Sequence, residues 1–268
     1  MDNQMKFLES HVSFKGEQRL YRYYSNVLER QLDLQIYVPV AQLKEKSCVV
    51  LYYLPSLSSD AELLASQSDY QRYANRYDLM VVIPDIFSAY RGNRQQKLMQ
   101  YWAEREKIAQ FIIEELPALM AEHFYIYDVQ GGMGYDFGGT VMLNLGLAYP
   151  EHFRGVSALA PWIGFWGTDW GKANVEALGI DASIDPAMAF VQGDAAENCP
   201  PIWIDQGTED PYLGAQIQPD RIQQAFGDHK NSENLWYRFH KKYDHSFYFV
   251  HSQIRQHFVF HSVFEHID

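Results

Sequence analysis

Three residues, Asp136, Asp210 and His245, each follow a predicted strand and are of types that carry acid–base and nucleophilic chemistry. A histidine titrates near neutral pH, so His245 can act as a general base and then as a general acid. A neighbouring carboxylate fixes the histidine tautomer and stabilises the imidazolium, a role that we assign to Asp210, with Glu209 as the alternative. Asp136 stands at the centre of a glycine-rich turn, where its carboxylate is the candidate nucleophile. Together they predict a hydrolytic site, working or remnant.

The glycine-rich turn covers residues 131–139 (GGMGYDFGG), between a predicted strand at 124–129 and a predicted helix at 140–148. Gly134 and Gly138, two residues before and after Asp136, let the backbone turn sharply and let strand and helix approach. Strand, glycine turn and helix predict a nucleophile elbow at the carboxyl end of a sheet. Serine normally occupies the central position in hydrolases. Nucleophile, acid and then histidine is the order in which α/β-hydrolases carry their triad.

Hydrophobic patterns predict the elements that position these residues. Alternation ended by proline predicts a half-buried strand at 32–39, whereas continuous apolar runs at 48–54 and 79–85 predict strands covered on both faces. A helix at 70–77 between those two runs indicates a parallel crossover. Further strands are predicted at 153–159, 202–206 and 235–239, and further helices at 101–123, interrupted by Pro117, and at 247–266. These elements predict a three-layer α/β fold, with a mostly parallel central sheet and helices on both faces.

The chain length of 268 residues favours a single domain over residues 1–268. Residues 160–200 differ in character from the rest. Trp162, Trp166 and Trp170 recur every four residues among glycines, which argues against one amphipathic helix. We interpret this segment as a small cap or lid, or as a structural insertion.

Composition excludes several classes of function. The formal net charge of −12 argues against a nucleic-acid partner, because phosphate binding needs a basic face. No apolar run is long enough to span a membrane, and the start lacks the layout of a signal peptide, so we predict a cytoplasmic protein with no membrane partner. Two cysteines, Cys48 and Cys199, give neither a disulfide framework nor a sulfur metal site, and we predict no metal and no cofactor. His257 and His261, four residues apart, are interpreted as packing or surface residues of the last helix.

Six motifs, spread in order over about two thirds of the chain, resemble the esterase D and S-formylglutathione hydrolase family, serine hydrolases of the α/β-hydrolase fold that act on thioesters and short esters. They are YQRYA at 70–74, VVIPD at 81–85, EELP at 114–117, VSALAP at 156–161, IDQG at 204–207 and YDHSFYF at 243–249. The resemblance implies the same fold, with Asp210 and His245 as the acid and the base of the triad.

The elbow departs from that family, which has Gly-His-Ser-Met-Gly-Gly where this chain has Gly-Tyr-Asp-Phe-Gly-Gly, so that Asp136 replaces the serine. The resemblance also implies that the oxyanion donors are the backbone N–H groups of Leu57 and Phe137. The loop that carries Leu57 is likewise changed, from Leu-Ser-Gly-Leu-Thr-Cys to Leu-Pro-Ser-Leu-Ser-Ser.

These departures leave three functions open. A carboxylate that attacks an acyl carbon gives a reactive anhydride and puts negative charge beside the forming oxyanion, which favours a protein altered or silent as a serine esterase. The first alternative is an active carboxylesterase or thioesterase on small acyl substrates. The second is a hydrolase that uses Asp136 as a nucleophile at saturated carbon, similar to haloalkane dehalogenases and epoxide hydrolases. In each case the partner is a small ester, thioester or related ligand, and a homodimer is left open.

Overall fold

The computed structural model describes residues 5–59, 61–179, 185, 187, 199–218, 220–227 and 234–263. Within these residues, nine strands form one sheet in the order β1-β2-β3-β5-β4-β6-β7-β8-β9. By its internal contacts the chain divides into two compact units, Met1–Gly131 with Ile254–Asp268, and Gly132–Gln253. A single domain over residues 1–268 therefore stays a prediction.

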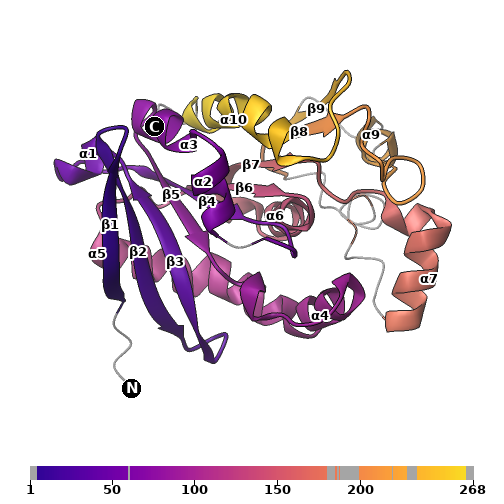
Figure 1. Cartoon of the computed structure of the whole chain (residues 1–268), viewed down its shortest axis with the longest axis horizontal. Helices are drawn as coiled ribbons and strands as arrows, with labels where there is room; N and C mark the ends of the chain where they lie inside the picture. The colour runs from indigo at the N-terminus through magenta and orange to yellow at the C-terminus, as the bar shows by residue number, and fades with distance from the viewer. Residues whose placement is uncertain are drawn as a thin grey trace. The chain divides into compact units, whose positions relative to one another are not determined.

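The first unit holds an antiparallel group of strands followed by a parallel pair (Figure 1). Strands β4 and β5 are buried along their whole length, as their apolar runs predict, and they pair in parallel, which confirms the crossover. Its elements are β1 (Lys6–Ser13), β2 (Gly16–Ser25), β3 (Arg30–Val38), α1 (Val40–Leu43), β4 (Val49–Leu54), α2 (Glu62–Gln67), α3 (Tyr70–Arg76), β5 (Leu79–Pro84), a 3-10 turn (Phe87–Ala89), α4 (Arg94–Gln110) and α5 (Leu116–His123).

The β1–β2 hairpin has no counterpart in the predictions from sequence. Its two turn residues, Phe14 and Lys15, have φ angles of 47° and 73°, the left-handed conformation that hairpin turns require. Glycine and asparagine normally mark such turns, so the sequence carries no turn signal here. Strand β1 is also exposed on both faces, which removes the alternation that would identify a strand.

The long helix predicted at 101–123 begins earlier and is not continuous. It starts as α4 at Arg94, where Asn93 and Gln96 form a reciprocal capping box, and ends as α5 at His123. Between them, residues Phe111–Glu115 form a π-helical turn that ends two residues before Pro117. Proline has no N–H and crowds the preceding turn, so the wider turn accommodates the break that Pro117 predicts.

The second unit contains the carboxyl-terminal strands and the helices between them (Figure 1). Strand β8 pairs in parallel with both β7 and β9, and α6 packs on β7. The elements are β6 (Gln130–Tyr135), α6 (Phe137–Ala148), a 3-10 turn (Pro150–His152), β7 (Phe153–Leu159), a 3-10 turn (Phe165–Gly167), α7 (Asp169–Leu178), β8 (Ile202–Gly207), α9 (Asp220–Gly227) and β9 (Leu235–His240). Helix α10 (Phe247–Ser262) begins in this unit, and its residues from Ile254 onward belong to the first unit. Residue 266, its predicted end, lies outside the described residues.

The strand that precedes the elbow is not at 124–129, where the apolar alternation predicts it. Tyr125 and Tyr127 are exposed, and only an isolated bridge joins Ile126 to Cys48. The strand is the glycine-rich stretch itself, β6. Neighbouring atoms lie so close to its glycines that no larger residue fits at those positions. A Cβ on Gly132 would lie 2.4 Å from the sulfur of Met142, on α6. Close packing therefore overrides the low strand propensity of glycine.

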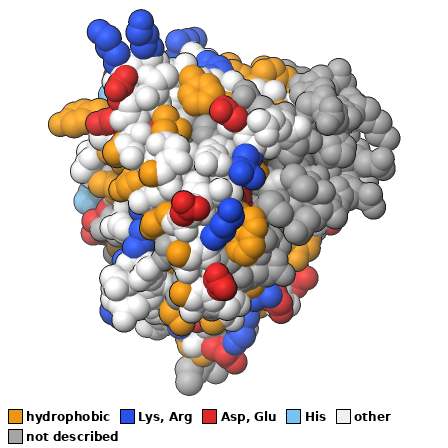
Figure 2. All heavy atoms as spheres, turned by 90° about the vertical axis from the view of Figure 1, so that its right-hand side faces the viewer, with side chains coloured by type: hydrophobic (Ala, Val, Ile, Leu, Met, Phe, Trp, Pro, Cys, Tyr) orange, Lys and Arg blue, Asp and Glu red, His pale blue; other side chains and the backbone are white. Residues whose placement is uncertain are grey.

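The segment predicted as a cap or lid begins with a 3-10 turn and continues as α7, and Trp162 in it is buried. Most of residues 180–198 lie outside the described residues, so the lid stays a prediction. No disulfide links Cys48 and Cys199. Among the described residues, no helix is both long and apolar enough to cross a membrane. The face in Figure 2 carries acidic, basic and hydrophobic side chains interspersed.

Candidate functional site

The structure forms a nucleophile elbow at Asp136, between β6 and α6. The backbone of Asp136 has φ 54° and ψ −127°, a conformation that a non-glycine residue adopts only under constraint. The Asp136 N–H donates to the carbonyl of Leu159 at 3.0 Å, which ties the elbow to β7. A Cβ on Gly134 would lie 2.5 Å from the backbone of Gly138, so the turn needs glycine at position 134. The elbow frame predicted from sequence is therefore present.

The three candidate residues meet in one group, and all belong to the second unit. His245 Nε2 lies 3.1 Å from Asp136 Oδ1, and His245 Nδ1 lies 2.6 Å from Asp210 Oδ2. Both carboxylates are buried, with 5% of Asp136 and 4% of Asp210 exposed. The imidazole of His245 therefore bridges two buried carboxylates, one on each ring nitrogen.

Neighbouring groups hold Asp210 and His245 in place. The side-chain amide of Gln206 donates to Asp210 Oδ2 at 2.6 Å, and the Tyr212 N–H donates to Asp210 Oδ1 at 2.9 Å. The Tyr135 hydroxyl donates to the backbone carbonyl of His245 at 2.5 Å. Glu209, the alternative acid, is exposed, and Asp210 is the carboxylate that contacts the histidine.

Trp162 is part of the group, although the sequence analysis placed it only in the segment interpreted as a cap, a lid or a structural insertion. Its indole N–H donates to Asp136 Oδ1, the same oxygen that faces His245. The backbone N–H and carbonyl of Trp162 both bond to the Thr140 hydroxyl at 2.9 Å, which fixes the residue to α6. Its ring also packs against Trp170 and Tyr212, with centroids 4.9 and 5.5 Å away. The four-residue spacing of the tryptophans gave no indication of which one reaches the carboxylate.

A comparison with models of known families matches most of the chain to one family. The family model described as "Putative esterase" matches residues 25–260, which is most of the chain. The chain belongs to this esterase family.

Solved structures similar to this esterase-family chain include the S-formylglutathione hydrolase of Agrobacterium tumefaciens, at 27% identity and a TM-score of 0.82, over 97% of this chain and 99% of that one. A CE1 ferulic acid esterase from Anaeromyces mucronatus, in complex with ferulic acid, is 19% identical, with a TM-score of 0.67, over 95% and 91%. The S-formylglutathione hydrolase of Staphylococcus aureus is 16% identical, with a TM-score of 0.65, over 97% and 99%. The last two show the fold alone. The mostly parallel sheet with helices confirms the predicted α/β-hydrolase fold class.

His245 carries a positive charge in this site of the esterase-family protein. Burial lowers the pKa of His245, but hydrogen bonds and ionic attraction to Asp136 and Asp210 outweigh it and raise the pKa to about 9. His245 is therefore an imidazolium at neutral pH. Asp136 also lies at the N-cap of α6, where the helix dipole favours a negative charge. The protonated ring of His245 therefore lies between the side chains of Asp136 and Asp210.

This raised pKa predicts that the stability of the esterase-family protein falls with increasing pH. The folded pKa of about 9 exceeds the ordinary value of 6.5, so the stabilisation is complete below about pH 6.5 and is lost as the pH rises through 9. The difference between these two pKa values corresponds to a loss of about 3 kcal/mol in the free energy of unfolding. Urea unfolding between pH 6 and pH 10 measures it. His245→Gln should remove this pH dependence. If the free energy of unfolding changes equally with pH in both proteins, His245 is not its source.

The two predicted oxyanion donors lie in different units. Phe137 is the first residue of α6, directly after Asp136, and is buried. Leu57 is buried in the loop after β4, where its carbonyl accepts from Lys97 Nζ at 2.8 Å. The role of both residues as oxyanion donors stays a prediction.

His257 and His261 are buried in α10, which confirms their packing role. Burial, and then the charge of His257, lower the pKa of His261 to about 3, so it is neutral at physiological pH. A Cβ on Gly131 would lie 2.7 Å from His261 Nδ1, so the imidazole fills the space beside that glycine. The described residues contain no group of three or more histidine, cysteine or acidic side chains placed to hold a metal ion.

Proposed function

We propose that this esterase-family protein is altered at its nucleophile and silent as a serine esterase at neutral pH. The observation that carries the proposal is the imidazolium of His245 held between Asp136 and Asp210, at 3.1 and 2.6 Å. The frame of a triad is kept, and the groups in it form an ion-paired cluster. Such a cluster stabilises the fold and presents polar groups to a bound ligand.

Two chemical requirements of ester hydrolysis are missing from this arrangement. A general base needs a neutral imidazole, whereas the raised pKa of His245 keeps it protonated at pH 7. A serine nucleophile gives an ester that water cleaves, whereas an attacking carboxylate gives an anhydride. The negative charge of Asp136 also opposes the oxyanion, at a step where each oxyanion donor normally contributes about 3–4 kcal/mol.

We infer a small ester, thioester or related acyl compound as the ligand, and the cytoplasm as the location. The support is the likeness to the Agrobacterium tumefaciens S-formylglutathione hydrolase, at 27% identity over nearly the whole of both chains. Buried aromatic side chains around Asp136, including Trp162, supply apolar surface for the organic part of such a ligand.

Displacement at saturated carbon is the second candidate function. The observation that favours it is the indole N–H of Trp162 beside Asp136, because a hydrogen-bond donor next to a carboxylate nucleophile can stabilise a departing anion. The direct contact of His245 Nε2 with Asp136 Oδ1 argues against it. In that contact the histidine binds the carboxylate itself and is not placed to activate a water molecule for the second step.

Ester hydrolysis by the wild-type protein tests the proposal. We expect no turnover of p-nitrophenyl acetate or butyrate above that of Asp136→Asn at pH 7, because both proteins lack a serine nucleophile at the elbow. Clear wild-type turnover that Asp136→Asn abolishes would overturn the proposal. Incubation with alkyl halides and epoxides, followed by mass spectrometry, tests the second candidate. A covalent ester on Asp136 would favour displacement, and its absence would count against it.

A further inference from the structure

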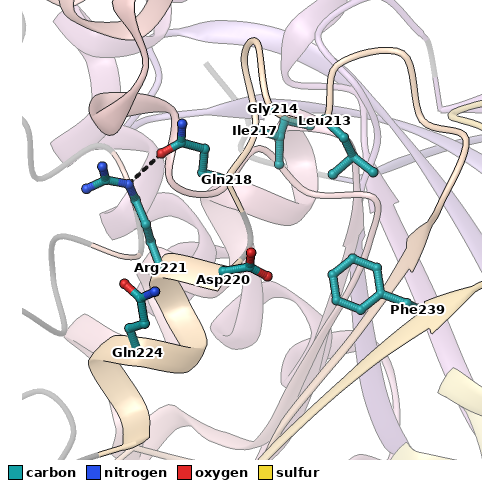
Figure 3. Close-up of a pocket in the computed structure, with 8 residues that line it drawn as sticks. All are labelled: Leu213, Gly214, Ile217, Gln218, Asp220, Arg221, Gln224 and Phe239. Carbon is teal, nitrogen blue, oxygen red and sulfur yellow. Dashed lines mark hydrogen bonds between the residues drawn. The ribbon is translucent and has the colours of Figure 1, made fainter.

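A second pocket of about 580 Å³ lies within the second unit, between α9, the loop before it and the end of β9 (Figure 3). None of its lining residues belongs to the group formed by Asp136, Asp210 and His245. The lining residues are Leu213, Gly214, Ile217, Gln218, Asp220, Arg221, Gln224 and Phe239.

One side of this pocket joins a negative charge to an aromatic ring. In Figure 3 the carboxylate of Asp220, at the start of α9, lies on the side that faces the ring of Phe239, below Leu213 and Ile217. Phe239 is 44% exposed, so its side chain is accessible to a ligand in the pocket. Arg221 extends to the other side, where its Nε donates to Gln218 Oε1 at 2.7 Å. The guanidinium group of Arg221 therefore points away from Asp220 and Phe239 and bonds to Gln218.

A buried hydroxyl lies behind this part of the pocket. Tyr237 shares a face of β9 with Phe239, and their rings meet edge to face with centroids 5.0 Å apart. The Tyr237 oxygen is buried and makes no hydrogen bond within the described part of the chain. Burial first, and then the charges of Asp220, Asp210 and Asp205, raise the pKa of Tyr237 well above its ordinary value. A buried hydroxyl without a partner is costly unless a ligand or water satisfies it.

We propose that this pocket binds a small organic ammonium ion that carries an apolar body. The ammonium group pairs with the Asp220 carboxylate and lies against the face of the Phe239 ring. The apolar body lies against Leu213 and Ile217. The formal net charge of −12 attracts cations to the protein surface and so favours the same class of ligand. This inference is independent of the function proposed for Asp136.

Calorimetric titration of the full chain with 2-phenylethylamine, 2-phenylethanol and 3-phenylpropanoate tests the proposal, because the three probes differ in the charge at one end. We expect saturable binding of the amine alone. Asp220→Asn should weaken the binding about tenfold or more, since it removes the ionic partner and keeps the shape. Phe239→Leu should weaken amine binding by several-fold, because it replaces the ring by an aliphatic side chain.

Asp169→Asn is the matched control, because Asp169 is also an exposed aspartate in the first turn of a helix, α7, and does not line the pocket. It should leave the amine affinity unchanged. Equal binding of the alcohol or the carboxylate, an unchanged affinity in Asp220→Asn, or no saturable binding of the amine up to about 10 mM would overturn the proposal. Binding should persist in Asp136→Ser, so the outcome is distinguishable from that of the esterase test.

Discussion

Replacing Asp136 by serine is expected to raise the turnover of p-nitrophenyl acetate at pH 8 by about a hundredfold or more over the wild-type protein. The variant places a hydroxyl nucleophile at an elbow whose backbone already has the required turn. It also removes one of the two anionic partners of His245, so the pKa of the imidazole falls toward neutrality and the ring can accept the serine proton. Asp210 continues to orient the ring.

Asp136→Ala is the control for that result, because it removes the same negative charge without adding a nucleophile. It should show no gain, and Asp136→Ser combined with His245→Gln should lose the gain. Circular dichroism and the melting temperature establish that each variant is folded. If folded Asp136→Ser is as inactive as Asp136→Ala, the site has lost more than its nucleophile, and the claim of a retained frame is wrong.

Replacing His245 by alanine is expected to lower the free energy of unfolding at pH 7 by about 3–5 kcal/mol. The reason is that Asp136 and Asp210, 5% and 4% exposed, would lose the cation that lies between them. Two buried carboxylates would then face each other, and one would have to take up a proton for the fold to persist. Urea unfolding followed by tryptophan fluorescence measures the loss.

A double-mutant cycle separates this ionic effect from the loss of a packed ring. In the Asp136→Asn background only one carboxylate remains, so His245→Ala should cost clearly less than it does in the wild-type protein. A cost that is the same in both backgrounds, or below about 1 kcal/mol in the wild type, would show that the imidazolium does not hold the group together.

Both predictions depend on Trp162 as well as on the triad positions. Its indole N–H and His245 share one oxygen of Asp136, so the carboxylate is held from two sides. A serine at this position would have a single oxygen to place between the same two neighbours. For this reason the reactivation experiment is best repeated with Trp162→Phe, which keeps the ring and removes the donor.

Local patterns in the sequence identified most of the elements and all three members of the ionised group. Apolar runs marked β4 and β5 because strands covered on both faces must be apolar throughout. The glycines around Asp136 marked the elbow, because a turn that brings Gly134 onto the backbone of Gly138 excludes any side chain. Chain order and strand ends then indicated Asp210 and His245 as its partners, and the structure brings all three together.

Other features were beyond the reach of local patterns. The hairpin turn at Phe14 and Lys15 carries no glycine or asparagine, and β6 consists largely of residues with low strand propensity, so the packing around them decides their conformation. The contact of Trp162 with Asp136 joins residues 26 positions apart, and nothing in the spacing distinguishes it from Trp166 or Trp170.

The sequence by itself determined that residue 136, at the centre of the glycine-rich turn, carries a carboxyl group, because residue identity and the glycine pattern are both local properties. Only the tertiary structure decided the state of that carboxylate. Burial and the two contacts of His245 raise the pKa of the imidazole to about 9 and so bind the group into an ion-paired cluster. A protonation state depends on the distances between side chains that are remote in the chain and on their access to solvent. The order of residues in the sequence gives neither quantity.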